Sequence, residues 1–201
     1  MLSVEMSSLW GSDIEQIVKG ITEATNNIKS YYNNENTNQN MLLALGEDVC
    51  EICNFWTGNT YVGHPKNKKV KKAFQSFFES LMELLLKMKD SKKDYEKRIA
   101  NAMLYRGTVY RYLGSAEPAK KAVAPKYNDI YVSWSKEPEN SYLECKLCGT
   151  MTWMSCKISA PYYGIDLEAI GCSRGDEREV VFPTIKKCIT EIKYISEEDD
   201  D

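Results

Sequence analysis

Two glutamates, Glu177 and Glu179, stand two residues apart just before an apolar run that ends at Pro183. If the segment from Glu177 to Phe182 is an extended strand, both carboxylates lie on one face and Arg178 lies on the other. Two like charges held together raise the pKa of at least one carboxyl group unless a cation compensates them. Such an arrangement is typical of active sites; a solvated edge strand that ends in a proline is the alternative interpretation.

Two upstream segments carry side chains that suit such a carboxylate. Arg106 follows an aromatic residue and precedes Gly107, so its guanidinium offers a fork of donors to a phosphate or carboxylate, and the glycine lets a ligand approach the backbone. Ser133 and Ser135 alternate with Trp134, and serines on one strand face can hold a neighbouring carboxylate by hydrogen bonds. The alternatives are a surface arginine and two strand-end serines that cap a following helix.

The order of these motifs resembles the mono-ADP-ribosyltransferase family. An aromatic-Arg-Gly segment, an aromatic-x-Ser-x-Ser strand and a Glu-x-Glu pair before an apolar run follow one another between Leu104 and Pro183. The match is to the Arg-Ser-Glu branch, which includes cholera-type and iota-type toxins, vertebrate ecto-transferases and small phage-encoded transferases. The segment from Tyr163 to Leu167 is also similar to the one that leads to the Glu-x-Glu loop in that family, and the resemblance covers Leu104 to Ile195.

The resemblance implies an enzyme that moves ADP-ribose from NAD to an arginine side chain of a target protein and releases nicotinamide, with no metal. Arg106 would hold the NAD phosphates, the backbone of Gly107 would meet the nicotinamide amide, and Ser133 would orient the catalytic carboxylate. Glu179 would be that catalytic residue, in contact with NAD, and Glu177 would act on the acceptor. An NAD glycohydrolase on the same fold is the alternative.

The implied chemistry fits these residue types. Breaking the nicotinamide–ribose bond passes through an oxocarbenium-like state, which a fixed carboxylate stabilises best in a dry site. An arginine acceptor is a poor nucleophile because its pKa exceeds about 12, so a second carboxylate can serve as its base. Two positions depart from the family pattern. Trp134 stands where threonine is common, and the loop from Gly171 to Asp176, which would help select the target, has Ser173 to Gly175 where an aromatic residue is often found.

The cysteines allow an interpretation from another class of function. Seven cysteines in 201 residues are an odd count, which fits reduced thiols better than a disulfide framework. Two C-x-x-C pairs, Cys50 with Cys53 and Cys145 with Cys148, could supply four thiolates to a structural zinc in a non-enzymatic interaction protein. Each pair falls in a predicted helix at i and i+3, so packing of small apolar thiols is the favoured interpretation. The single histidine, His64, makes a Ser–His triad improbable.

The bulk composition limits the classes of partner that we expect. The chain is 43% hydrophobic and 27% charged, as in ordinary globular proteins, and its net charge of −3 gives no reason to expect nucleic acid. No apolar run approaches the length of a membrane span, and the N-terminus lacks the basic and apolar regions of a secretory signal. We therefore expect a cytoplasmic protein, of the producing, infected or recipient cell, whose partner is the target that carries the acceptor arginine.

The elements that must position these residues change character near residue 104. Helical spacing of apolar residues predicts helices at Ile14 to Ile28, Met41 to Phe55, Val70 to Met88 and Ser91 to Leu104. Beyond them, β-branched and aromatic runs predict strands at Leu104 to Tyr110, Asp129 to Ser133, Thr150 to Ile158, Glu177 to Phe182 and Cys188 to Ile195, with a short helix at Asn140 to Leu147. We expect an α+β fold in which a helical region, 1–103, packs on a small mixed β-sheet core of the ADP-ribosyltransferase type, 104–195, followed by an acidic disordered tail, 196–201.

Overall fold

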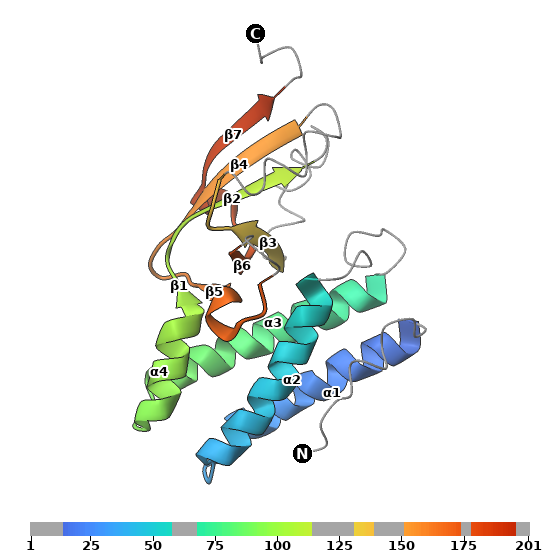
Figure 1. Cartoon of the computed structure of the whole chain (residues 1–201), viewed down its shortest axis with the longest axis vertical. Helices are drawn as coiled ribbons and strands as arrows, with labels where there is room; N and C mark the ends of the chain where they lie inside the picture. Colours follow the sequence, from blue (N-terminus) through green and yellow to red (C-terminus); the bar gives the residue numbers. More distant parts are fainter. Residues whose placement is uncertain (1–13, 58–67, 114–130, 139–150, 174–177, 196–201) are drawn as a thin grey trace. The chain divides into compact units, whose positions relative to one another are not determined.

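The computed structural model describes residues 14–57, 68–113, 131–138, 151–173 and 178–195 (Figure 1). The chain divides into two compact units. The helical unit comprises residues 1–102 together with 170–172, and the strand unit comprises residues 103–169 together with 173–201. Because one unit is built on helices and the other on an antiparallel sheet, the predicted α+β class is confirmed. The predicted helix at Asn140 to Leu147 and the tail lie outside the described residues.

The helical unit contains four helices in its described part, and each overlaps a predicted one. Their bounds are Ile14–Tyr32 (α1), Gln39–Thr57 (α2), Lys68–Lys89 (α3) and Asp94–Met103 (α4). Helix α2 begins two residues before the predicted Met41, because the Asn38 side chain accepts the Met41 backbone N–H at 3.0 Å and so caps the helix start. An asparagine-rich segment predicts a loop, but its sequence does not indicate which asparagine caps the start of the next helix.

Aromatic side chains from two helices form the core of the helical unit. The Trp56 ring of α2 meets Phe74 and Phe78 of α3 edge to face, with centroids 4.9 and 5.0 Å apart. Helix α1 contributes Ile17 and Ile21, both fully buried and spaced for one helical face. The wide apolar stripe that predicted α3 therefore faces the core of the helical unit, which is the usual position of such a stripe.

Seven strands make a single sheet in the strand unit, within the part that the structure describes. Their order across the sheet is β1-β5-β6-β3-β2-β4-β7, with bounds Leu104–Tyr105 (β1), Gly107–Leu113 (β2), Tyr131–Ser135 (β3), Met151–Ile158 (β4), Gly164–Asp166 (β5), Glu179–Pro183 (β6) and Ile189–Ile195 (β7). Every described strand pair is antiparallel, so the expected mixed sheet is wrong. Figure 1 shows β2, β4 and β7 side by side.

Two strand predictions need correction. The single strand predicted from Leu104 to Tyr110 is broken at Arg106, because β1 pairs with β5 whereas β2 pairs with β3 and β4. Strand β5 was not predicted, since three residues are too short to show alternation; all three are buried.

Trp134 lies in the core of the strand unit, where its Nε1–H donates to the Phe182 carbonyl at 3.1 Å.

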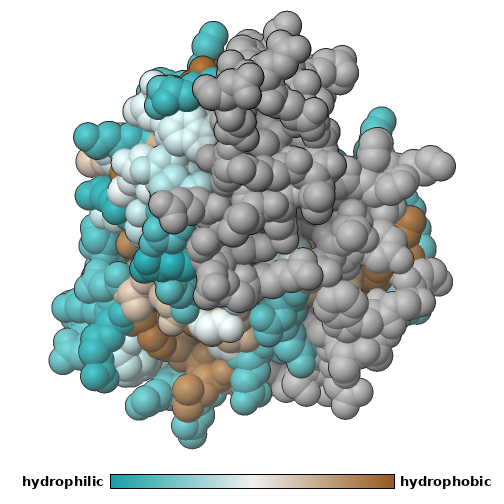
Figure 2. Space-filling view, turned by 45° about the horizontal axis from the view of Figure 1, so that its top comes forward, coloured by the Kyte–Doolittle hydropathy of each residue, from teal (hydrophilic) through white to brown (hydrophobic). Residues whose placement is uncertain are grey.

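The described surface is largely polar. On the face shown in Figure 2, hydrophilic side chains cover most of the coloured surface, and the brown area is smaller. The large hydrophobic side chains that are exposed all belong to the helices: Ile14, Tyr32, Leu43, Leu86 and Ile99. Among the residues that the structure describes, no helix is long and apolar enough to cross a membrane.

Candidate active site

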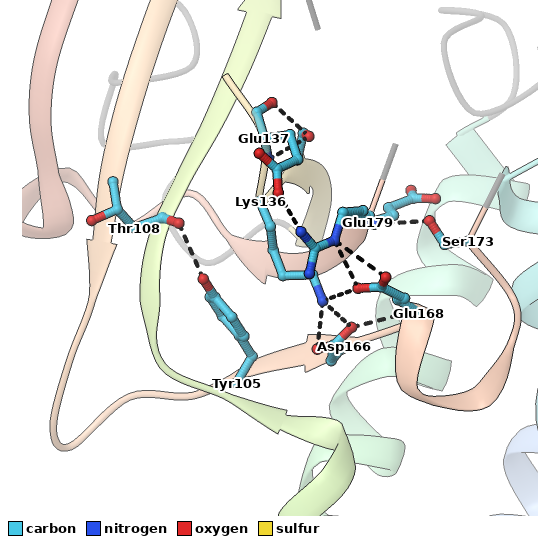
Figure 3. Close-up of polar contacts among 10 residues, drawn as sticks. Tyr105, Thr108, Lys136, Glu137, Asp166, Glu168, Ser173 and Glu179 are labelled. Carbon is cyan, nitrogen blue, oxygen red and sulfur yellow. Dashed lines mark hydrogen bonds and ion pairs between the residues drawn. The ribbon is translucent and has the colours of Figure 1, made fainter. Parts of the chain in front are cut away.

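Glu179 is the best-enclosed carboxylate of the predicted site. It opens β6, is only 3% exposed, and lies directly opposite Ser135 of β3 in the antiparallel register. Its backbone is held on both sides, because its N–H donates to the Ser173 hydroxyl at 2.9 Å and its carbonyl accepts the Leu167 N–H at 2.9 Å (Figure 3). A carboxylate anchored in this way has a defined position and little contact with water.

The strand that carries Glu179 begins two residues later than the strand predicted from Glu177. Arg178 has a φ of 46°, which is left-handed, and β6 begins directly after it, at Glu179. Glu177 itself lies outside the described residues. The structure thus positions the proposed cleavage residue and leaves the acceptor residue as a prediction.

The two serines of β3 have different surroundings. Ser135 is buried, and its hydroxyl donates to the Glu137 carbonyl at 2.8 Å and accepts the Glu137 N–H at 3.0 Å. Ser133 is half-buried, lies opposite Val181, and shares the strand face of Ser135. The register therefore brings the serine strand beside the glutamate strand, with Ser135 rather than Ser133 directly across from Glu179.

Arg106 and Gly107 lie at the junction of β1 and β2. The Arg106 Nε donates to the Tyr162 carbonyl at 3.1 Å, and its guanidinium carbon sits 3.9 Å from the centre of the Tyr163 ring. At Gly107, a Cβ would lie 2.4 Å from the Tyr105 hydroxyl oxygen, so no larger residue fits without moving that ring. Arg106 is exposed, and these contacts orient it without burying it.

Arg111, which the motif analysis missed, is the cation whose charge acts on Glu179. It lies in β2, and its Nη1 donates to the Ser133 carbonyl at 3.1 Å. Loss of hydration lowers the pKa of the Arg111 guanidinium to about 10, and the negative charge of Glu179 opposes this shift. The position was recognisable in principle: Arg111 is two residues from the fully buried Val109, and residues two apart share a strand face.

A cluster of charged side chains surrounds the approach to β6 (Figure 3). Lys136 lies 3.0 and 3.2 Å from the two Asp166 oxygens and also bonds Glu168, whose carboxylate is 3.2 Å from the Arg178 Nε. Burial would lower the pKa of Lys136, but the hydrogen bonds and charges of Glu168 and Asp166 raise it above its usual value. The cluster links the end of β3, the end of β5 and the residue before Glu179.

These contacts explain why Glu179 holds one geometry. The Lys136 N–H donates to the Arg178 carbonyl at 3.1 Å, so the left-handed residue is tied to β3 by its backbone as well as by its side chain, which also bonds Glu137. Nothing in the sequence motif pointed to Lys136 or Asp166. Their pairing joins residues 30 positions apart, and only the strand order brings them together.

The structure describes two of the four cysteines proposed for the zinc site. Cys50 and Cys53 lie in α2 as predicted, whereas Cys145 and Cys148 lie outside the described residues. Within the ranges that the structure covers, no group of three or more histidine, cysteine, aspartate or glutamate side chains is placed to hold a metal ion. Cys156 and Cys188 are buried in the core of the strand unit, where they pack as small apolar residues.

The chemical capacity of the site follows from its geometry. A nearby guanidinium favours the ionised form of a buried carboxylate, and an ionised carboxylate can stabilise positive charge that develops on a bound molecule. Serine hydroxyls one strand away can orient such a group or its ligand. Comparisons with known proteins add no identity: no family model, no curated protein and no solved structure matches the chain.

Proposed function

We propose that this chain is an NAD-dependent mono-ADP-ribosyltransferase that moves ADP-ribose to an arginine side chain of a target protein and releases nicotinamide. The observation that carries the proposal is the position of Glu179. It is 3% exposed, opens β6, and lies across from the Tyr131–Ser135 strand that supplies the Ser-x-Ser motif. Two of the motifs, separated in the chain, supply the adjoining strands β3 and β6, and the third lies between β1 and β2 of the same sheet.

Glu179 has the properties that cleavage of the nicotinamide–ribose bond requires. As the bond breaks, positive charge develops on the ribose, and a carboxylate that accepts a hydrogen bond from the 2′-hydroxyl stabilises this charge. Burial strengthens that interaction because little water screens it. The charges of Glu179 and Arg111 interact, and an opposite charge nearby favours the ionised form of a carboxylate.

Hydrogen bonds of neighbouring groups guide the roles that we assign to Ser133 and Arg106. The hydroxyl of Ser135 bonds the Glu137 backbone, so Ser133, on the same strand face, is the serine that we assign to orienting Glu179 or the ribose. The Nε of Arg106 is engaged by the Tyr162 carbonyl, so its terminal Nη groups are the ones that we expect to grip the NAD phosphates. Glu177 is proposed as the base for the acceptor arginine on the sequence motif alone.

The direct test is transfer of label from adenine-labelled NAD to proteins of a cell lysate. We expect labelled protein with the wild type and at least about 100-fold less with Glu179→Gln, because the substitution removes the charge and keeps the shape. Glu191→Gln is the matched control, since Glu191 is an exposed strand glutamate in β7 that pairs with Lys193. Mass spectrometry of labelled peptides then shows whether arginine is the acceptor.

Each outcome separates the hypotheses. Free ADP-ribose without labelled protein favours the NAD glycohydrolase. Unchanged transfer by Glu179→Gln contradicts the assignment of the catalytic residue. Complete absence of NAD turnover, together with about one zinc per chain by metal analysis, favours the non-enzymatic interaction protein.

A further inference from the structure

Two cysteines that are distant in the chain lie together in the helical unit. Cys50 belongs to α2, and Cys172 belongs to the short segment of residues 170–172 that joins this unit. The Cys50 thiol donates to the Ile170 carbonyl at 3.6 Å, and the Cys172 thiol donates to the Cys50 carbonyl at 3.6 Å and to the Ile170 carbonyl at 3.5 Å. Both sulfurs therefore lie within 3.6 Å of the same Ile170 carbonyl oxygen.

The members of this pair differ in access and in acidity. Cys172 is 2% exposed, whereas Cys50 is half-buried and is the thiol that a small oxidant reaches first. The neighbouring Cys172 thiol lowers the pKa of Cys50, although burial opposes the shift, and the neighbouring Cys50 thiol together with burial raises the pKa of Cys172. A thiolate is the nucleophile in oxidation chemistry, so Cys50 suits the attacking role and Cys172 the resolving role.

We propose that Cys50 and Cys172 are a modification site, a thiol pair that a hydroperoxide converts into a reversible disulfide. Both are free thiols in this structure, and the two sulfurs approach the same Ile170 carbonyl oxygen, at 3.6 Å from Cys50 and 3.5 Å from Cys172. Cys53 lies one helical turn from Cys50 in α2 and is fully buried.

The reaction balances with hydrogen peroxide as the oxidant. The Cys50 thiolate attacks one peroxide oxygen, the O–O bond breaks, and the departing hydroxide takes the proton that the Cys50 thiol released, which gives water and a sulfenic acid. The Cys172 sulfur then attacks the Cys50 sulfur, the S–O bond breaks, and the hydroxide leaves with the Cys172 proton as a second water. Two thiols lose two electrons in total, and the peroxide gains them.

The disulfide has a consequence for the candidate active site that rests on the proposed function. Cys172 directly precedes Ser173, whose hydroxyl accepts the Glu179 backbone N–H at 2.9 Å. A bond from Cys172 to Cys50 restrains the backbone that carries Ser173. We expect the oxidised protein to transfer ADP-ribose more slowly than the reduced protein, with activity restored by dithiothreitol.

Peptide mapping tests the modification independently of any activity. The full-length protein is reduced, treated with a small excess of hydrogen peroxide, blocked with an alkylating agent and digested without reductant. We expect a linked peptide that contains Cys50 and Cys172 and that disappears on reduction. Cys53→Ser should retain this link, whereas Cys172→Ser should lose it and leave Cys50 as a sulfenic acid that dimedone traps. Circular dichroism confirms that the variants are folded.

The result that overturns the proposal is equally specific. A wild-type map in which Cys50 stays reduced, or is linked to Cys53 or any cysteine other than Cys172, rules the pair out without reference to a variant. If the link forms but transfer is unchanged, the modification stands and its effect on the site is wrong. If the link forms and the reduced protein has no transferase activity, the proposed function fails and the thiol pair remains.

Discussion

Arg111 shows how a single residue can determine whether a buried carboxylate works. Glu179 is nearly inaccessible to water, and a lone negative charge in such a place is costly. The guanidinium of Arg111 offsets that cost while it also holds the Ser133 carbonyl at 3.1 Å. The residue that we assign to catalysis and the residue that we assign to its orientation therefore share one cationic neighbour.

A double-mutant cycle tests this coupling. Arg111→Met should destabilise the protein by about 1–3 kcal/mol, because it leaves the Glu179 charge without its neighbour. In the double variant with Glu179→Gln, the loss should be smaller than the sum of the two single losses by about 1 kcal/mol. Urea denaturation at pH 7 measures the four free energies of unfolding.

The matched control combines Glu179→Gln with Arg98→Met. Arg98 is an exposed arginine of α4 in the helical unit, so its effect and that of Glu179→Gln should simply add. Additive losses in the Arg111 cycle as well would mean that Arg111 has no specific role toward Glu179.

At the scale of elements, the contact between β5 and β6 helps to determine where the strand that carries Glu179 begins. Gly164 of β5 is buried against the next strand, and a Cβ there would lie 2.5 Å from the Val180 Cγ1 and 3.1 Å from the Ile158 Cδ1. The close approach of these strands is what sets the Leu167 N–H against the Glu179 carbonyl. A three-residue strand without a distinctive pattern thus has a structural role.

Replacement of this glycine should loosen the site. Gly164→Ala should lower the free energy of unfolding by about 1–3 kcal/mol, because two packed side chains must shift. Gly46→Ala is the matched control: nothing lies within 4 Å of a Cβ at this exposed position of α2, so alanine should stabilise the helix by about 0.5–1 kcal/mol. Equal effects of the two substitutions on the urea midpoint would contradict the close packing of β5.

At the scale of the whole molecule, a cluster of polar contacts within the helical unit makes the stability pH-dependent. In the helical unit, the Glu96 carboxylate accepts the Tyr31 hydroxyl at 2.8 Å and lies 3.5 Å from the Lys93 ammonium. Burial would raise the pKa of Glu96, but hydrogen bonds from Ser91 and Tyr31 and the charge of Lys93 lower it below its ordinary value of 4.5. A pKa depressed by folding adds stability above the unfolded value, and this stability is lost as the pH falls through the folded value.

Glu96→Gln should therefore destabilise the protein by about 1–2 kcal/mol at pH 7, and the difference from the wild type should shrink at about pH 3. Hydrogen exchange should report the loss in the amides of α1 and α4 more than in those of β2 and β4, since these contacts lie within the helical unit. Glu83→Gln, at an exposed position of α3, is the control that should show no pH-dependent difference. Equal loss of protection in helices and strands would show that the two units unfold together.

The sequence by itself determined the features that depend on local pattern. Apolar spacing predicted all four described helices, because the side chains on one helical face recur every three or four residues. Alternation and composition predicted five strand segments, with shifts at their ends. The roles that the motif order assigns to Glu179, Ser133 and Arg106 stay predictions. The α+β class followed from the same local signals.

Only the tertiary structure decided which residues share a site. Arg111 joins Glu179 across a separation of 68 residues, taken as 179 minus 111, and Cys50 meets Cys172 across 122. Such pairs leave no local pattern, because strand order and chain reversal bring them together rather than spacing. The left-handed backbone of Arg178 likewise depends on contacts from Lys136 and Glu168, so the true start of the strand that carries Glu179 was set by partners distant in the chain.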